Sequence, residues 1–366
     1  MKRVGMVIGQ LTYGGAERQL YEACTRLPQH GIDPIVYCLS ENTEPYRELL
    51  ESKGIQVRTF SRSSHFDVKR GWALRKRIRE DRIDLLHSWL IDDNPYAWMA
   101  TVGTRLRFIA SLRSRPTRRD PLRKRIDRFV FNSAQCVLAN SLEVRDFLVE
   151  EFRIEEKRIE VIENGIDLDR LMPARSKAEV RKKNGTPLED FLVLFVGRLD
   201  KVKRADFLLE SFSFAIKERP NMSLWMVGEG PMKEELANLA ANLEIDEKVH
   251  FLGTRSDVGD LYHAADLFAL CSETEGLPNV VVESMACGTP VLLSGGANCS
   301  DLVSNGENGW ICDEMTIDRF SSLLVGIVDT PQNRSAAGEA ARESSRERFS
   351  IEKMLKNLKK MYLEVE

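Results

Sequence analysis

The stretch Ser272–Val291, SETEGLPNVVVESMACGTPV, decides the fold class of this 366-residue chain. An apolar run, Leu267–Leu270, comes directly before it, and the stretch itself passes from a loop rich in Gly, Pro and Asn into a helical pattern. A second apolar run, Pro290–Leu293, closes it. Strand, loop, helix and strand in this order are typical of a parallel α/β sheet. Open sheets of this class bind ligands at the carboxyl ends of their strands, where this loop lies.

The same alternation of apolar runs and helical patterns extends over the whole chain and predicts two domains. The other expected strands are Val4–Ile8, Ile35–Leu39, Arg82–His87, Phe108–Ser111, Cys136–Ala139, Phe191–Val196, Ser223–Val227 and Val249–Phe251. A polar stretch with an Asn-Gly turn interrupts the series, so we place an N-terminal domain at 1–170, a linker at 171–189 and a C-terminal domain at 190–348. An amphipathic pattern predicts a helix over 349–366, which can pack back on the N-terminal domain.

Composition excludes several classes of protein. Hydrophobic residues make up 43% and charged residues 30%, which is typical of a globular chain and not of a disordered one. No window reaches the ~18 apolar residues of a membrane span, and the N-terminus lacks the pattern of a secretory signal. The seven cysteines are scattered without Cys-x-x-Cys spacing. We therefore expect neither a disulfide framework nor a cysteine-based zinc site, and a cytoplasmic location.

The loop after Leu270 carries the residues that favour a phosphorylated ligand. Backbone N–H groups near Asn279–Val281, at the start of the expected helix, can bind an anion such as a diphosphate. Glu275 and Glu283 are eight residues apart and so reach different parts of one ligand. Taken alone, such acidic residues are equally explained by the helix dipole, which favours carboxylates near a helix start.

The segment resembles the donor-site signature of the family-4 retaining glycosyltransferases, which have two facing Rossmann-like domains with a cleft between them, the GT-B fold. Other segments resemble this family in the right order, and together they span nearly the whole chain. They are Gly9–Arg18, Val161–Asp167, Phe195–Lys203, Val227–Pro231, Val249–Gly253 and Asn305–Gly309. The resemblance is most specific in the C-terminal half.

The resemblance implies a role for each matching residue. Arg198 and Lys203 would hold the donor diphosphate and stabilise the charge that grows on it as the glycosidic bond breaks. Glu275 would accept hydrogen bonds from sugar hydroxyls, and Glu283 from the ribose. The remaining donor-binding residues would be Gly14, Gly15, Gly197, Gly276, Leu277, Pro278, Asn279 and Val280. Two alternatives remain: Arg198 and Lys203 are an ordinary basic pair, and Asn279 is only a turn residue.

The acid–base group on the acceptor side is open. His87 fits a family histidine at a strand end, but the further histidine that many relatives carry is absent, and Asp92 stands nearby. Either residue can serve, or the departing phosphate can take the acceptor proton, or His87 is a mere strand-end hydrogen-bonding residue. The sequence Asp167-Leu168-Asp169 matches the Asp-x-Asp pattern of metal-dependent transferases, but that pattern belongs to a different transferase fold. We therefore expect no metal ligands and no cofactor.

Charge is distributed unevenly between the halves. Residues 1–170 carry 30 basic and 25 acidic side chains, whereas residues 171–366 carry 23 and 31. Ten basic residues and two acidic ones fall within 105–128. A solvated helical face is one explanation; an anionic membrane or acceptor is the one we prefer, and nucleic acid is a poorer account. The candidate residues are Arg113, Arg115, Arg118, Arg119, Arg123, Lys124 and Arg125.

These observations predict a metal-independent retaining transferase. It would move a hexose-type sugar from a nucleotide-sugar, UDP-linked by expectation, to a glycan or lipid-linked acceptor in polysaccharide, lipopolysaccharide or glycoconjugate assembly. Its place would be the cytoplasm, peripheral to the inner face of the plasma membrane. The rival hypotheses are a catalytically impaired GT-B module that acts as a nucleotide- or glycan-binding scaffold, and a different two-domain enzyme such as a nucleotide-sugar epimerase.

Overall fold

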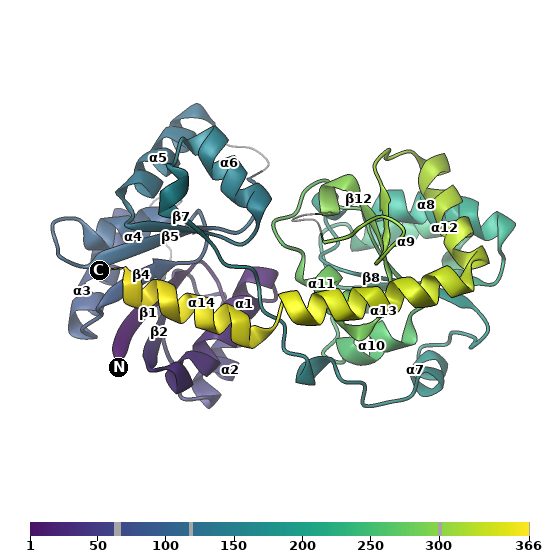
Figure 1. Cartoon of the computed structure of the whole chain (residues 1–366), viewed down its shortest axis with the longest axis horizontal. Helices are drawn as coiled ribbons and strands as arrows, with labels where there is room; N and C mark the ends of the chain where they lie inside the picture. The colour runs from purple at the N-terminus through teal and green to yellow at the C-terminus, as the bar shows by residue number, and fades with distance from the viewer. Residues whose placement is uncertain (62–66, 117–119, 299–301, 366) are drawn as a thin grey trace. The chain divides into compact units, whose positions relative to one another are not determined.

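The computed structural model describes residues 1–61, 67–116, 120–298 and 302–365, and it divides the chain into two compact units (Figure 1). Unit 1 consists of Met1–Gly165 together with Ile351–Glu366, and unit 2 of Ile166–Ser350. Each unit is built on one parallel sheet with helices between successive strands. The short apolar runs of the sequence form these strands because both faces of such a sheet are covered by helices.

Unit 1 contains a seven-stranded sheet in the order β3-β2-β1-β4-β5-β6-β7. The strands are β1 (Lys2–Ile8), β2 (Ile32–Cys38), β3 (Gln56–Thr59), β4 (Leu85–Ser88), β5 (Arg107–Leu112), β6 (Cys136–Ala139) and β7 (Ile159–Val161). In the register, Val4 of β1 lies beside Pro34 of β2 and Leu85 of β4. The strand order reverses between β1 and β4, so this is the switch point of the sheet.

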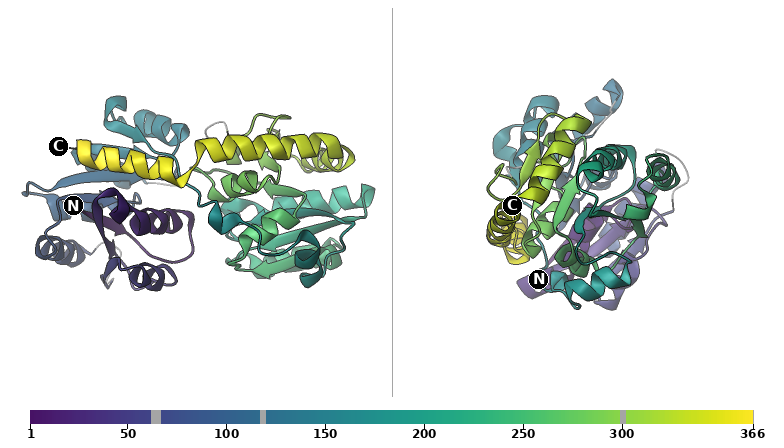
Figure 2. Two further views of the ribbon diagram at one scale, coloured as in Figure 1. Left: turned by 60° about the horizontal axis from the view of Figure 1, so that its bottom comes forward. Right: turned by 90° about the vertical axis from the view of Figure 1, so that its right-hand side faces the viewer.

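Helices cover both faces of this sheet and enclose two apolar cores. Val4 and Met6 contribute to one core and Val7 to the other, as alternation along a strand requires. The first face carries α1 (Gly15–Arg26), α2 (Tyr46–Ser52) and α14 (Ile351–Glu364); the second carries α3 (Val68–Glu80), α4 (Asn94–Thr101), α5 (Pro121–Ser133) and α6 (Leu142–Phe152). Figure 2 shows α14 beside α1.

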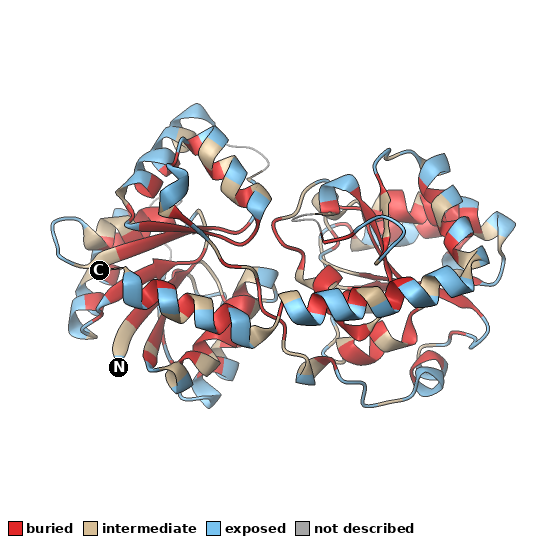
Figure 3. Ribbon diagram, viewed as in Figure 1, coloured by how far each residue is buried: buried red, intermediate tan, exposed pale blue. Residues whose placement is uncertain are grey.

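Unit 2 contains a six-stranded sheet in the order β10-β9-β8-β11-β12-β13. The strands are β8 (Phe191–Val196), β9 (Met222–Val227), β10 (Val249–Gly253), β11 (Leu267–Leu270), β12 (Val291–Ser294) and β13 (Trp310–Cys312). The helices are α7 (Lys177–Lys183), α8 (Ala205–Glu218), α9 (Lys233–Asn242), α10 (Val258–Ala264), α11 (Asn279–Cys287), α12 (Ile317–Asp329) and α13 (Pro331–Arg348). The strands are buried and the helices expose one side (Figure 3). The switch point lies between β8 and β11.

The division between the units differs from the expected one. The stretch 171–189, expected to be a linker, belongs to unit 2 and contains α7. Arg181 of α7 is 1% exposed, donates to the carbonyl oxygens of Leu188 and Asp190 at 2.9 and 2.7 Å, and pairs with Asp266 at 2.6 Å. This buried guanidinium fastens the polar stretch to the sheet. Composition alone could not predict this contact, because a charged residue usually lies at the surface.

Candidate functional site

The carboxyl ends of β8 and β11 bring together the two loops that the sequence singled out in unit 2. Gly197 and Arg198 follow β8, whereas Glu275 and the residues up to Pro278 follow β11. Because β8 and β11 are neighbours at the switch point, their loops share the edge at which open α/β sheets bind ligands. Most of the expected donor residues therefore lie at one edge of one sheet.

These two loops are bonded to each other. The Glu273 N–H donates to the Val202 carbonyl at 2.9 Å, and Lys203 Nζ lies 2.5 Å from Glu275 Oε1. Asp200 holds the lysine segment, because its Oδ1 accepts the N–H groups of Val202 and Lys203 at 3.1 and 3.3 Å. The Lys203 and Glu275 side chains are 23% and 12% exposed. A cation and a carboxylate are thus fixed side by side at the sheet edge.

Arg198 is arranged differently from Lys203. Its side chain is 69% exposed, and its Nε lies 3.5 Å from Asp200 Oδ2. The guanidinium is therefore accessible to an anion from solvent, held by a weak surface pair rather than by a buried one. After β8, the edge thus offers a partly buried cation, Lys203, and an exposed one, Arg198.

Two glycines allow the backbone around this edge to pack closely. Gly228 adopts a φ of +132°, and a Cβ on it would lie 2.0 Å from the Gly197 carbonyl oxygen. A Cβ on Gly296, after β12, would lie 2.2 Å from the Glu273 carbonyl oxygen. Any larger residue at either place would push the β8 or β11 loop out of position.

The start of α11 offers fewer backbone donors than expected. The N–H groups of Val281 and Val282 both donate to the Pro278 carbonyl, at 3.0 and 3.3 Å. Val281 is therefore not available to an anion, and that part of the expectation was wrong because the first turn closes on Pro278. Gly276, Leu277 and Pro278 are buried, whereas Asn279 and Val280 are half-buried. Anion binding by the helix start would have to use the first two residues of α11.

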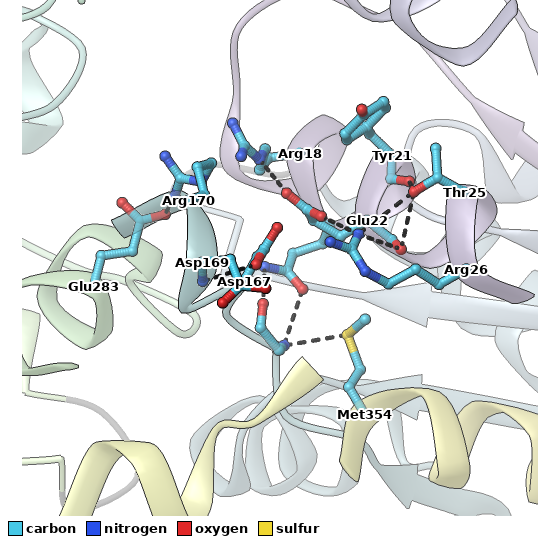
Figure 4. Close-up of polar contacts among 12 residues, drawn as sticks. Arg18, Tyr21, Glu22, Thr25, Arg26, Asp167, Asp169, Arg170, Glu283 and Met354 are labelled. Carbon is cyan, nitrogen blue, oxygen red and sulfur yellow. Dashed lines mark hydrogen bonds and ion pairs between the residues drawn. The ribbon is translucent and has the colours of Figure 1, made fainter. Parts of the chain in front are cut away.

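Glu283 lies on α11 and is 8% exposed. Its Oε1 forms an ion pair with Arg170, and its Oε2 accepts the Tyr262 hydroxyl at 3.1 Å; Figure 4 shows Arg170 beside Glu283. Burial, followed by the Glu283 charge, raises the pKa of Tyr262 well above its ordinary value, so this hydroxyl stays a donor. The sequence missed Arg170 and Tyr262, which are brought to Glu283 from η3 (Asp169–Leu171) and α10.

Asp167 and Asp169 form a local turn. Asp167 Oδ1 accepts the Asp169 N–H at 3.1 Å. Within the described ranges, no group of three or more His, Cys, Asp or Glu side chains is arranged to hold a metal ion.

The corresponding edge of unit 1 holds two buried carboxyl groups. Asp93 is 3% exposed, and its Oδ2 accepts the Gly9 N–H at 2.9 Å. Burial, then the neighbouring Asp92, raises the pKa of Asp93 well above its usual range, and burial also raises the pKa of Glu17. Glu17 accepts from Gln10 at 3.1 Å. Asp93 was missed, although its place before Asn94-Pro95 is a recognisable helix-start signal.

The glycine pair after β1 begins α1. Gly14 is the N-cap of the helix, with an extended φ of −171°, and Gly15 is its exposed first residue. A Cβ on Gly14 would meet the Glu17 carboxylate at 2.1 Å, so the pair leaves room for that side chain.

His87 is placed as a structural residue and not as an exposed acid or base. It is 0% exposed; its Nδ1 lies 2.7 Å from the Tyr362 hydroxyl and its Nε2 lies 2.8 Å from Ser111 Oγ. The ring stacks on Trp89. Burial, helped by the Arg113 charge, lowers the pKa of His87 well below its ordinary value, which keeps it neutral. Both ring nitrogens are occupied inside unit 1, which contradicts a catalytic role and favours the alternative of a strand-end hydrogen-bonding residue.

Asp92, the other candidate base, is accessible. Its side chain is 71% exposed, and its Oδ1 lies 2.8 Å from Arg123 Nη2. This pairing lowers the number of unpaired basic side chains in the segment, because Arg123 and Lys124 contact acidic residues that lie outside 105–128. Lys124 pairs with Glu151 of α6. The expectation of a uniform basic patch is corrected here, since sequence counts miss partners that other elements supply.

The remaining basic candidates divide into three groups. Arg115 and Arg125 are exposed, as a membrane or acceptor contact requires. Arg113 is only 8% exposed, so it is not part of a surface patch. Arg118 and Arg119 lie outside the described residues.

The outer face of α5 is unexpectedly apolar. Leu122, Ile126 and Phe129 are 68%, 41% and 55% exposed, at spacings that place them on one side of the helix. Beside them lies a hollow of about 340 Å³. It is lined by Pro95, Trp98, Met99, Arg125, Ile126, Phe129 and Val130.

Comparison with known proteins assigns both halves of the chain. Residues 13–170 match the family model described as Glycosyltransferase Family 4, and residues 176–344 match that of Glycosyl transferases group 1. An uncharacterized glycosyltransferase of Haemophilus influenzae is 35% identical over 176 residues, which are 47% of this chain and 49% of that protein. The alignment with this relative thus spans about half of its length.

Two further likenesses cover almost the whole chain. The UDP-Gal:alpha-D-GlcNAc-diphosphoundecaprenol alpha-1,3-galactosyltransferase of Escherichia coli is 24% identical over 368 residues, or 96% of this chain and 94% of that one. The crystal structure of Anabaena Alr3699/HepE in complex with UDP and glucose aligns with a TM-score of 0.89 and 20% identity, over 99% of this chain and 100% of that one. The structural likeness shows the fold, which is of the GT-B class: two Rossmann-like parallel sheets and a C-terminal helix.

Proposed function

Because the chain belongs to the family 4 glycosyltransferases, we propose that it transfers a hexose-type sugar from a UDP-sugar to a glycan or lipid-linked acceptor, with retention of configuration and without a metal ion. The observation that carries this proposal is the pairing of Lys203 with Glu275 at the β8–β11 edge. It holds a cation, which suits a phosphate, next to a carboxylate, which suits sugar hydroxyls, and a nucleotide-sugar presents a diphosphate next to a sugar.

The proposed reaction needs charge stabilisation more than it needs a protein base. The bond between the sugar C1 and the β-phosphate oxygen breaks, and negative charge accumulates on the nucleoside diphosphate. Lys203 and Arg198 oppose this charge and so stabilise the transition state more than the ground state. The acceptor hydroxyl oxygen forms the new bond to C1 on the same face, and its proton passes to the departing phosphate. The burial of His87 supports this route over a histidine base.

On this proposal Glu275 and Glu283 set the position of the donor. When a sugar hydroxyl approaches, Glu275 exchanges part of its contact with Lys203 for a hydrogen bond to that hydroxyl. Glu283 accepts from the ribose hydroxyls with the lone pairs that Arg170 and Tyr262 leave available. Arg170 and Tyr262 are positioning residues, because they orient the Glu283 carboxylate.

The acceptor side of the proposal is a lipid-linked molecule at an anionic membrane, in assembly of a cell-surface glycan. The E. coli relative acts on a diphosphoundecaprenol-linked sugar. The apolar face of α5, with Arg125 and Arg128 exposed beside it, suits a helix that lies in a membrane interface. None of the described helices is long and apolar enough to span a bilayer.

A nucleotide-sugar screen tests the proposed function against its rivals. The full-length protein is incubated with UDP-, GDP- and dTDP-hexoses, with and without a lipid-linked acceptor fraction, and the products are identified by mass spectrometry. A transferase releases the nucleoside diphosphate much faster when acceptor is present. An epimerase changes the sugar without any acceptor. A scaffold binds nucleotide and turns over nothing, which would refute the proposed activity.

A further inference from the structure

Arg113 is a buried cation surrounded by neutral groups. Its Nη1 donates to Asn164 Oδ1 at 3.0 Å, and its guanidinium lies over the Trp89 ring at 3.9 Å from the centroid. Its Nε is buried and has no hydrogen-bond partner among the described residues. Burial lowers the pKa of this guanidinium to about 9, and no described carboxylate offsets this effect. A buried charge is costly unless it is paired.

Arg181 shows what a purely structural arginine looks like in this chain. It is also buried, at 1% exposure against 8% for Arg113, but it pairs with Asp266 and donates to backbone carbonyls. Arg113 has an amide oxygen and an aromatic face in place of the carboxylate. Among the described residues, Arg113 therefore has no carboxylate as counter-ion.

A second unpaired atom lies next to Arg113 on the same face of the sheet. Arg113 follows β5 and Asn140 follows β6, each directly after the last residue of its strand. The Asn140 side chain is 2% exposed, its Nδ2 donates to the Arg113 carbonyl at 3.0 Å, and its Oδ1 has no partner within the described chain. At the carboxyl edge of unit 1, one buried donor on a cation and one buried acceptor thus have no partner within the described ranges.

We propose that Arg113, Asn140 and Asn164 form a binding site for an anionic group of the acceptor, a phosphate or a carboxylate borne on a sugar. The Arg113 Nε–H donates to an oxygen of the anion, and Asn140 Oδ1 accepts a hydroxyl of the same sugar. This inference rests on the proposed function, since it names the chemical class of the acceptor at the unit 1 edge. It concerns residues other than those of the donor site in unit 2.

The rival account is that Arg113 only fastens the Asn164-Gly165 turn, where unit 1 ends. The variant Asn164→Asp separates the two accounts, because it keeps the acceptor oxygen and gives Arg113 a carboxylate of its own. If Arg113 only fastens the turn, Asn164→Asp should be at least as stable as the wild type and should bind ligands unchanged. If Arg113 binds an anion, Asn164→Asp should be at least as stable as the wild type, and its new carboxylate should displace the anion.

The test is calorimetric titration of the full-length protein with matched sugar pairs, at saturating UDP so that the donor site is occupied. N-acetylglucosamine 1-phosphate is compared with N-acetylglucosamine, and galacturonate with galactose. The wild type should bind one anionic member at least 10-fold more tightly than its neutral partner. Preference for the sugar phosphate assigns a phosphate; preference for galacturonate assigns a carboxylate. Loss of a charge-assisted hydrogen bond in Arg113→Gln should weaken the anionic ligand about 10- to 100-fold.

Arg105→Gln is the matched control, because Arg105 is exposed, lies just before β5 and is not among the candidate site residues. It should bind both members of each pair as the wild type does. Asn164→Asp should lose the anion preference without a lower melting temperature, which keeps the test valid if Arg113→Gln fails to fold. No anion preference in the wild type, or an undiminished one in Asn164→Asp, overturns the inference. UDP binding, measured separately in each variant, should be unchanged; its absence from the wild type would count against the donor proposal instead.

Discussion

Lys203 Nζ and Glu275 Oε1 lie 2.5 Å apart, although 72 residues separate them and they follow different strands of the unit 2 sheet. The contact joins the loop after β8 to the loop after β11 at the switch point. It brings two of the expected site residues into one pair and orders both side chains before any ligand arrives. Preorganised charge of this kind stabilises a transition state without reorganisation during the reaction.

Replacing Lys203 by Ala should lower turnover by about 10²–10³, the typical effect of removing one group that stabilises transition-state charge. The fold should persist, with a melting temperature lowered by a few degrees at most, because Glu275 loses a partner at a partly exposed edge. Steady-state kinetics and thermal unfolding measure the two effects. Lys201→Ala, two residues earlier and exposed, is the control and should remain fully active. Near-normal turnover in Lys203→Ala would remove this lysine from the site.

Activity should survive treatment with EDTA. The proposed donor site opposes the diphosphate with Arg198 and Lys203, so a divalent cation has no charge left to neutralise there. Turnover is measured after dialysis against chelator and after readdition of Mg²⁺ or Mn²⁺. Complete loss with full recovery on readdition would show that the cation set of the site is incomplete without metal.

Asp93→Asn should make the protein more stable relative to the wild type as pH rises from about 4 to 7. The pKa of Asp93 is raised in the folded state, so the folded state binds the proton more tightly than the unfolded chain does. Wild-type stability therefore falls as pH rises from the unfolded pKa of about 3.9 towards the folded one, by about 1.4 kcal/mol for each unit of difference. Asn cannot ionise, and its oxygen can still accept from Gly9.

Urea unfolding of both proteins over this pH range measures that effect. The charge of Glu17, whose pKa is also raised, helps to raise the pKa of Asp93, so the comparison is repeated in a Glu17→Gln background. A difference in unfolding free energy between the wild type and Asp93→Asn that stays constant from pH 4 to 7 would show that Asp93 ionises normally.

Binding to vesicles should depend on both the apolar and the basic residues of α5. The double variant Leu122→Ser, Phe129→Ser removes exposed apolar area, and Arg125→Glu, Arg128→Glu reverses exposed charge. Each should reduce co-sedimentation with vesicles rich in anionic lipid. In the wild type, salt should weaken only the part of vesicle binding that comes from the basic residues, because exposed charges are screened beyond ~8–10 Å at physiological ionic strength.

The charge reversal deliberately omits Arg123 and Lys124, because Asp92 and Glu151 already oppose them. Turnover with a soluble, truncated acceptor should persist in both double variants. Equal and negligible sedimentation of the wild type with anionic and neutral vesicles would reduce α5 to a solvated face.

The sequence was sufficient to predict the two parallel sheets and the edge at which the expected donor residues gather. Apolar runs such as Phe191–Val196 are unambiguous, and loops that follow neighbouring parallel strands must meet at one edge. The edge strands β3 and β13 were missed because β3 is polar and buries only Val57, and β13 has only three residues.

The sequence could not predict which distant elements supply the contact partners of a side chain. His87 is buried because Tyr362, 275 residues later, donates to or accepts from its ring. Arg113 was counted with its charged neighbours, yet the end of β5 turns it inward over Trp89. Asp92 drew attention while Asp93 beside it is the buried one. In each case the residue type was informative and its surroundings were set by the fold.

The measurement that tests the central claim most directly is calorimetric titration of UDP into the wild type and into Lys203→Ala, Glu283→Gln and Lys201→Ala. The claim is that a uridine diphosphate-sugar binds at the β8–β11 edge of unit 2. It predicts one UDP per chain for the wild type, binding at least 10-fold weaker in Lys203→Ala and Glu283→Gln, and unchanged binding in Lys201→Ala. Absence of UDP binding by the folded wild type, or equal affinity in all four proteins, would contradict it.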